Sequence, residues 1–288
     1  MSLQALFDGL FSGSVYGLVA LTLTITYQPT RIMNFAQGET FILGAAVGFE
    51  LVGVRKLPWP VGLAVMLALA VVMGLIMERM VMLPVQLSGS RFAWIIATLA
   101  AALIFQAVFS IRYVGDTLTF FPIIDKTFSI GGAAVSAQQI IAIVVSLTII
   151  VVYDQFLRRS IYGRAMRATA HNPDTAIILG VPTKRLVVGA FVGSAVLGAL
   201  AGFLWAPENF VNPANGLAFT ISGFTAAVIG GVGSPRGALF GGLIVGLLNS
   251  IAGALFGGIA AGIAVFIALG LILILKPAGL FGKPMDGH

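Results

Sequence analysis

The sequence contains no cysteine, which excludes disulfide bonds and thiolate metal sites. Its only histidines, His171 and His288, are too far apart to form a metal site with ordinary spacing. There is no G-x-x-x-x-G-K-[ST] phosphate loop, and the apolar runs hold no Ser/His pair, paired Asp or HExxH arrangement. We therefore expect a chain that is not an enzyme and that uses neither a metal nor a cofactor.

Charged residues are also scarce. They make up 9% of the 288 residues, while 59% are hydrophobic, whereas soluble domains carry about 25% charged residues. Because so few charges cannot cover the surface of a soluble chain, the sequence predicts a protein that crosses a lipid membrane several times. The net charge of +6 then reports membrane orientation and is not interpreted as a sign of nucleic-acid binding.

The apolar segments predict an all-α polytopic membrane protein, since a membrane span needs about 20 residues. About nine segments, within a range of eight to ten, have suitable length, and we expect them to form one transmembrane domain over residues 1–288. They lie at 5–27, 34–54, 59–83, 92–113, 137–157, 186–206, 217–233, 237–256 and 258–275. Residues 114–136 place turn residues between short β-prone runs, which predicts a small external hairpin.

The basic residues predict the orientation of these segments. If the basic loop 158–185 is cytoplasmic, alternation puts twelve Lys and Arg residues inside and four outside. This excess agrees with the positive-inside rule. We therefore expect an external N-terminus and a cytoplasmic C-terminus.

Two of the segments are interrupted. Residues 27–44 and 217–237 each combine a short apolar helix with a polar or Gly/Pro-containing break, and the predicted orientation makes them enter from opposite sides. The second break contains Gly230, Gly231, Gly233, Ser234 and Pro235. Paired interruptions of this kind point to a substrate pathway near the middle of the membrane.

Polar side chains in these segments have two interpretations. Asn34 suits the N-cap of a helix, and Glu39 would lie near the positive end of its dipole. Alternatively, an ionisable group at membrane depth marks a functional site. The isolated polar residues of the other spans also have a structural interpretation, in which they form hydrogen bonds between helices. The candidate pathway residues are Asn34, Gln37, Glu39, Thr98, Gln106, Thr220, Ser222 and Thr225.

The loop 158–185 contains a short helix with clear ends. Asn172 suits the N-cap, Pro173 the first helical position and Gly180 the position after the end. A helix of about seven residues is not stable alone in water, so its apolar face must pack against something. That surface is either the groove of a partner protein or the chain's own helical bundle.

Several motifs resemble those of the branched-chain amino acid type permeases of bacterial ABC importers. They are MNFAQGE (33–39), ERMVMLPV (78–85), YGRAMRATAHNPDTAIILGV (162–181), FTAAVIGGVGSPRGALFGG (224–242) and KPAGLFGKP (276–284). Their order and spacing match over roughly residues 9–284. One position differs, because Gln37 stands where many members of the family have histidine, which removes a titrating role there.

The resemblance implies a permease without ATPase activity that moves a small polar solute by alternating access. Branched-chain or other amino acids, urea, short amides and aromatic acids are its possible substrates. The implied partners are a second related or identical permease, two cytoplasmic ATPases and a periplasmic substrate-binding protein. The resemblance also favours docking of the ATPases on the loop 158–185. The candidate coupling residues are Arg164, Arg167, Asp174, Ala176, Ile177, Leu179 and Gly180.

Two alternatives remain from the residues alone. An ion-coupled secondary transporter would explain the broken helices and Glu39, but the spans hold few acidic residues for an ion relay. A solute channel would explain Asn212-Pro213-Ala214, but the only other Asn-Pro, at 172–173, lies in the basic loop.

Overall fold

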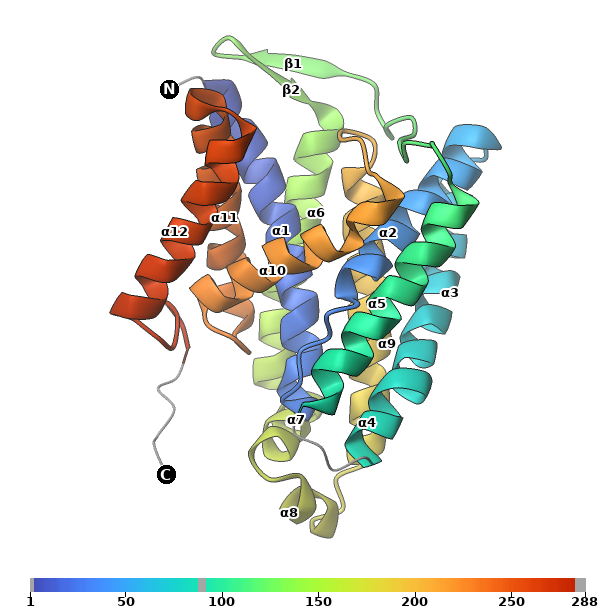
Figure 1. Ribbon diagram of the computed structural model, residues 1–288, viewed down its shortest axis with the longest axis vertical. Helices are drawn as coiled ribbons and strands as arrows, with labels where there is room; N and C mark the ends of the chain where they lie inside the picture. Colours follow the sequence, from blue (N-terminus) through green and yellow to red (C-terminus); the bar gives the residue numbers. More distant parts are fainter. Residues whose placement is uncertain (1–2, 88–91, 283–288) are drawn as a thin grey trace. The chain divides into compact units, whose positions relative to one another are not determined.

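A computed structural model of the chain describes residues 3–87 and 92–282 (Figure 1). The protein is mostly helical. This is expected of a polytopic membrane protein, because a helix pairs its backbone N–H and C=O groups within the span. Within these residues, seven helices are long and apolar enough to cross a membrane. They are α1 (Leu3–Thr30), α3 (Trp59–Ile76) with its continuation to Val85, α5 (Ala93–Arg112), α6 (Ala137–Arg159), α9 (Thr183–Trp205), α11 (Pro235–Phe256) and α12 (Gly258–Leu275).

Two further helices are shorter and correspond to the two predicted interrupted segments. Helix α2 (Gln37–Gly48) continues as a π-helical segment, Phe49–Val54, and α10 (Gly216–Gly230) follows a 3₁₀ turn, Pro213–Asn215. The predicted break after α10 is confirmed, since Gly231 and Gly233 have positive φ angles of 105° and 84°. The chain then restarts at α11, where the Ser234 side chain accepts a bond from the Gly237 N–H.

The remaining elements are short. The continuation of α3 consists of a π-helical segment, Met77–Met82, and α4 (Leu83–Leu87), and the loop between α6 and α9 holds α7 (Ile161–His171) and α8 (Pro173–Ile178). The predicted hairpin is present, formed by antiparallel β1 (Thr127–Ile130) and β2 (Ala133–Ser136) at the end of the predicted range. Earlier in that range, Leu118 forms an isolated bridge with Val211.

The chain folds into two compact units. The first comprises the described parts of Met1–Thr24, Pro122–Tyr153 and Ile221–His288. Here α1 and α11 approach through glycines, because a Cβ on Gly242 would overlap Gly17 and one on Gly246 would overlap Gly13. Small residues allow such close approach of helices in lipid, where packing drives association.

The C-terminal segment completes the first unit by capping α10. The Leu280 N–H donates to the carbonyl of Ile229 at 3.0 Å, and the Phe281 N–H donates to that of Gly230 at 2.8 Å. The last carbonyls of a helix lack intrahelical partners. The segment after α12 therefore satisfies the carboxyl end of α10.

The second unit comprises Ile25–Phe121 and Asp154–Thr220. Both α2 and α3 pack against α9. Glycines set the distance between α2 and α9, because a Cβ on Gly44 would overlap the Ala199 carbonyl and one on Gly202 would overlap the Phe41 carbonyl. A buried apolar cluster that includes Met77, Phe191 and Ala101 joins α9 and the continuation of α3 to α5.

Candidate functional site

The connection between α1 and α2 arranges the first polar residues of the site. Asn34 Oδ1 accepts a hydrogen bond from the Ala36 N–H at 3.0 Å, but Asn34 is not the N-cap that the sequence predicted. The helix itself begins at Gln37, so Ala36 occupies the N-cap position and its side chain makes no capping bond. Asn34 therefore orders the turn that leads into α2.

Gln37 attaches the start of α2 to α9. Its Nε2 donates to the Ser194 carbonyl at 3.1 Å and to Thr40 Oγ1 at 3.0 Å, and its Oε1 accepts from Ser194 Oγ at 2.8 Å. A Cβ on Gly198, one turn along α9, would overlap Thr40 Oγ1 and would lie 2.8 Å from Gln37 Nε2. Both ends of the Gln37 side-chain amide therefore have hydrogen-bond partners. Because residue 198 is a glycine, there is room beside α9 for this amide and for Thr40 Oγ1.

The start of α10 meets the start of α2 at Thr220. Its hydroxyl accepts a bond from the Gly38 N–H at 2.7 Å and donates to the Phe35 carbonyl at 3.1 Å. The backbones touch here, because a Cβ on Gly38 would overlap the Gly216 carbonyl. Two short helices therefore meet at their N-terminal turns, a position where backbone N–H groups lack intrahelical acceptors.

Glu39 lies at this junction and differs from its neighbours. Its side chain is 1% exposed, and its carboxylate occupies the place where a Cβ of Gly216 would be. Neither carboxylate oxygen has a hydrogen-bond partner among the residues that the structure describes. A capping role would require a bond to a first-turn N–H, so the geometry supplies only the favourable helix dipole.

The other candidate pathway residues lie apart from this cluster. Thr98 is buried and donates to the Trp94 carbonyl of its own helix at 2.7 Å, and the Trp94 ring stacks on Phe35 with 6.1 Å between centroids. Gln106 Nε2 donates to the Ala214 carbonyl at 2.7 Å, just before α10. Ser222 and Thr225 belong to the other compact unit.

The loop between α6 and α9 contains the predicted short helix with its predicted ends. Asn172 Oδ1 accepts from the Thr175 N–H at 3.0 Å, Pro173 opens α8, and Gly180 follows its end with a φ of 80°. Ala176 is buried, whereas Ile177, Ile178 and Leu179 are 57%, 83% and 75% exposed. These three residues form an apolar knob that the described part of the chain leaves exposed.

Helix α7 was not anticipated from the sequence, although Ser160 is a recognisable N-cap whose Oγ accepts from the Gly163 N–H at 2.9 Å. Of the candidate coupling residues, Arg164 is exposed, and Arg167 Nη1 donates to the Leu157 carbonyl at 2.6 Å. Arg167 therefore attaches α7 to the end of α6. The side chain of Asp174 is outside the part of the chain that the structure describes.

Arg31 connects this loop to the polar site, and sequence reasoning did not identify it. Its Nε donates to the Ala170 carbonyl near the end of α7 at 3.1 Å, and its guanidinium lies 5.6 Å from the ring centroid of Tyr27. Arg31 has a φ of 58°, a left-handed conformation that costs a non-glycine residue roughly 1–2 kcal/mol. Strained backbone of this kind persists where surrounding contacts hold it in place.

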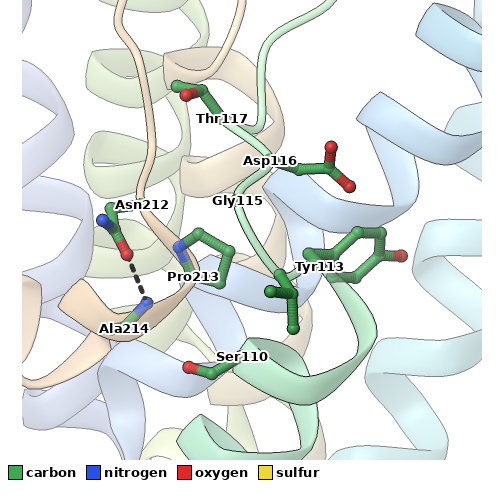
Figure 2. Close-up of a pocket in the computed structure, with 9 residues that line it drawn as sticks. Ser110, Tyr113, Gly115, Asp116, Thr117, Asn212, Pro213 and Ala214 are labelled. Atoms are coloured by element: carbon green, nitrogen blue, oxygen red, sulfur yellow. Dashed lines mark hydrogen bonds between the residues drawn. The ribbon is translucent and has the colours of Figure 1, made fainter.

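A pocket of about 300 Å³ lies beside the C-terminal end of α5 (Figure 2). Its lining includes Ser110, Tyr113, Asp116, Thr117 and Asn212, whose Oδ1 accepts from the Ala214 N–H at 2.8 Å. Burial raises the pKa of the Tyr113 phenol. The charges of Glu50 and Asp116 raise that pKa further, and the charge of Arg112 opposes them.

An ion-pair cluster lies near this pocket. Glu50 accepts from Arg55 at 3.1 Å and from Arg112 at 3.0 Å, and both arginines are largely exposed. Exposed pairs contribute about 0–1 kcal/mol each. The cluster therefore orients the ends of α5 and of the π-helical segment and adds little to stability.

Sequence comparison relates the chain to membrane permeases. The family profile described as "Branched-chain amino acid transport system / permease component" matches residues 5–275. The high-affinity branched-chain amino acid transport system permease proteins LivH of Escherichia coli and BraD of Pseudomonas aeruginosa are each 29% identical, covering 98% of this chain and 96% of their own. A probable branched-chain amino acid transport permease protein LivH of Methanocaldococcus jannaschii is 30% identical over 79% of this chain and 73% of its own.

A solved structure has a similar fold. PsaBC from Streptococcus pneumoniae, in complex with a Fab, superposes with a TM-score of 0.51 and 17% sequence identity. The similarity covers 97% of this chain and 95% of that chain. At this level of identity it is evidence for the fold alone.

Proposed function

Because the chain belongs to the family of branched-chain amino acid transport system permease components, we propose that it is the membrane permease subunit of an ATP-driven importer. It carries an amino acid with a branched side chain across the bacterial inner membrane by alternating access. The names of the curated relatives support this class of substrate. A second permease, two cytoplasmic ATPases and a periplasmic binding protein complete the importer.

The observation that carries this proposal is the uncovered apolar knob on α8. A six-residue helix with caps at both ends is too short to be stable alone, yet it exposes Ile177, Ile178 and Leu179. An apolar helix face of this size is a typical partner for a groove on another protein. We assign that groove to the ATPase, with Arg164 and Asp174 at its margin.

The contacts of the second unit supply a route from the knob to the polar site. Movement of α8 is passed to α7, and Arg31 connects the end of α7 to the chain between α1 and α2 through Ala170. That chain leads within a few residues to Asn34 and α2. The strained Arg31 backbone makes this connection sensitive to displacement of α7.

The pathway itself passes the junction of α2 and α10. Asn34, Gln37, Glu39 and Thr220 lie there. Thr98 and Gln106 on α5, and Ser222 and Thr225 on α10, are further candidate pathway residues of this proposal. Asn34, Gln37, Glu39 and Thr220 are buried, and we interpret this burial as the closed state of the junction.

The topology follows from the same proposal. The seven long helices together with α2 and α10 make nine membrane segments in one permease domain, with the N-terminus in the periplasm and the C-terminus in the cytoplasm. This orientation places α7 and α8 on the side where the ATPases lie.

A charge on the knob tests the proposal. In Leu179→Glu we expect the permease to fold, because the side chain is exposed, but to lose co-purification of the ATPase and ATP-driven leucine uptake. Phe210→Glu is the matched control: Phe210 is 80% exposed and follows the other end of the 23-residue α9, about 35 Å from α8. It should retain ATPase binding.

Two results would contradict the proposal. If Leu179→Glu binds the ATPase and transports as the wild type does, α8 is not the docking element. If the isolated permease in liposomes accumulates leucine on a proton or sodium gradient, the chain is a secondary transporter.

A further inference from the structure

We propose that Glu39 is the counter-ion for the ammonium group of the transported solute, and this inference rests on the permease function proposed above. It makes Glu39 a specificity-determining residue, which selects solutes with a primary ammonium group over otherwise similar solutes without one.

The hydrogen bonding of the junction sets Glu39 apart. Asn34 Oδ1, both ends of the Gln37 side-chain amide and the Thr220 hydroxyl all have hydrogen-bond partners within the chain. Glu39 is buried among the same elements, yet neither of its oxygens has a partner among the described residues. The acceptor capacity left open at this site is therefore concentrated in one carboxylate.

Burial makes this arrangement costly for an ionised carboxylate. A buried charge without a partner is strongly unfavourable, and proteins normally pair it with an opposite charge or with several hydrogen bonds. Chains retain intramembrane carboxylates of this kind mainly at functional sites. A partner that arrives during the transport cycle would relieve the cost, and only in the state where it is bound.

The surrounding backbone holds the carboxylate in place without bonding to it. Gly216 contacts Glu39 directly, because a Cβ at residue 216 would overlap Oε1 and would lie 2.7 Å from Oε2. Glu39 and Gly216 lie in the first turns of α2 and α10, the two short helices whose separation would open the pathway. Separation at this point exposes the carboxylate.

The chemistry of the carboxylate selects the ligand. A primary ammonium has three N–H donors and a positive charge, so it can satisfy both oxygens and neutralise them together. A solute that offers only hydroxyl groups supplies donors without charge, and a carboxylic acid without an amine adds a second negative charge. Amino acids are small solutes that carry such an ammonium group.

The first test is uptake by the complete importer in proteoliposomes, with loaded binding protein outside and ATP inside. Glu39→Gln should lower leucine uptake about 10- to 100-fold, the loss expected when a charged hydrogen-bond partner is removed, whereas ATP hydrolysis should change less than uptake. Glu39→Asp keeps the charge and should retain more uptake than Glu39→Gln. Asp125→Asn, which changes an exposed acid before β1, should transport as the wild type does.

The second test uses the wild-type importer and does not depend on a variant that folds. Dicyclohexylcarbodiimide modifies carboxyl groups in apolar surroundings, and mass spectrometry measures its labelling of Glu39. Millimolar L-leucine should protect Glu39, whereas 4-methylpentanoate, the same molecule without the amine, should not.

Several outcomes would overturn the inference. They are wild-type uptake by Glu39→Gln, equal protection by leucine and 4-methylpentanoate, and protection by sodium ions in the absence of leucine. Failure of the permease function itself is distinguishable, because the wild-type importer would then show no ATP-driven uptake at all.

Discussion

Replacing Gly202 by alanine should destabilise the protein, whereas the same replacement at Gly193 on the same helix should not. At Gly202 the new Cβ would overlap the carbonyl oxygen of Phe41 and would lie 2.7 Å from its carbonyl carbon and 3.1 Å from its Cα. These are backbone atoms, which no rotamer change can move away. Helices α2 and α9 would have to separate.

The expected change in stability of Gly202→Ala follows from two opposing effects. Overpacking costs about 1–3 kcal/mol, and replacing glycine by alanine in a helix returns up to about 1 kcal/mol. The net loss at Gly202 is then about 0–2 kcal/mol, which corresponds to a fall in Tm of up to about 8 °C. At Gly193 no atom of the described residues outside its own helix lies within 4 Å of the new Cβ. Only the gain in helix propensity then remains, and Tm should stay level or rise.

The assay is thermal unfolding of the two purified variants in one detergent, followed by helical circular dichroism. The control is internal, because both substitutions have the same chemistry and lie on the same helix. Equal Tm values for Gly202→Ala and Gly193→Ala would refute the conclusion that backbone contact sets the distance between α2 and α9.

Two further predictions concern the connections at the ends of the short helices. Arg31→Gly removes the guanidinium bond to Ala170 together with the left-handed strain, so Tm should not fall, yet ATP hydrolysis should become uncoupled from uptake; a variant that remains coupled would exclude Arg31 from the route. Leu280→Pro removes the N–H that caps the Ile229 carbonyl and should lower the free energy of unfolding by about 1–3 kcal/mol. Leu280→Ala, which keeps that N–H, serves as its control in thermal unfolding, and equal losses in both variants would show that the cap contributes nothing.

Local signals in the sequence predicted the elements whose ends depend on single residues. The bounds of α8 follow from Asn172, Pro173 and Gly180, whose backbone preferences are strong enough to act without tertiary contacts. The break after α10 follows in the same way from its glycines and Pro235. Hydropathy located the long helices, because spanning length is a property of each segment alone.

The contacts of the polar site could not be predicted in this way. Gln37 and Ser194 are 157 positions apart in the chain, and nothing in either segment indicates that they meet. The role of Gly216 depends on the carboxylate of Glu39 lying against it, which composition cannot reveal. The π-helical segments after α2 and α3 were also not predicted from the sequence.

The contacts around α2 indicate which side of the site opens. Toward α9, α2 is held by backbone contact at Gly44 and Gly202 and by the bonds of Gln37 with Ser194. Toward α10, α2 makes a backbone contact between Gly38 and the Gly216 carbonyl, and its polar contacts pass through the hydroxyl of Thr220. Packed interfaces resist continuous deformation, and the backbone contacts with α9 lie at Phe41 and Gly44, well inside α2, whereas the backbone contact with α10 lies only in its first turn. We therefore expect α2 to move together with α9. The junction with α10 is then the one that separates, and separation there is what gives a solute access to Glu39.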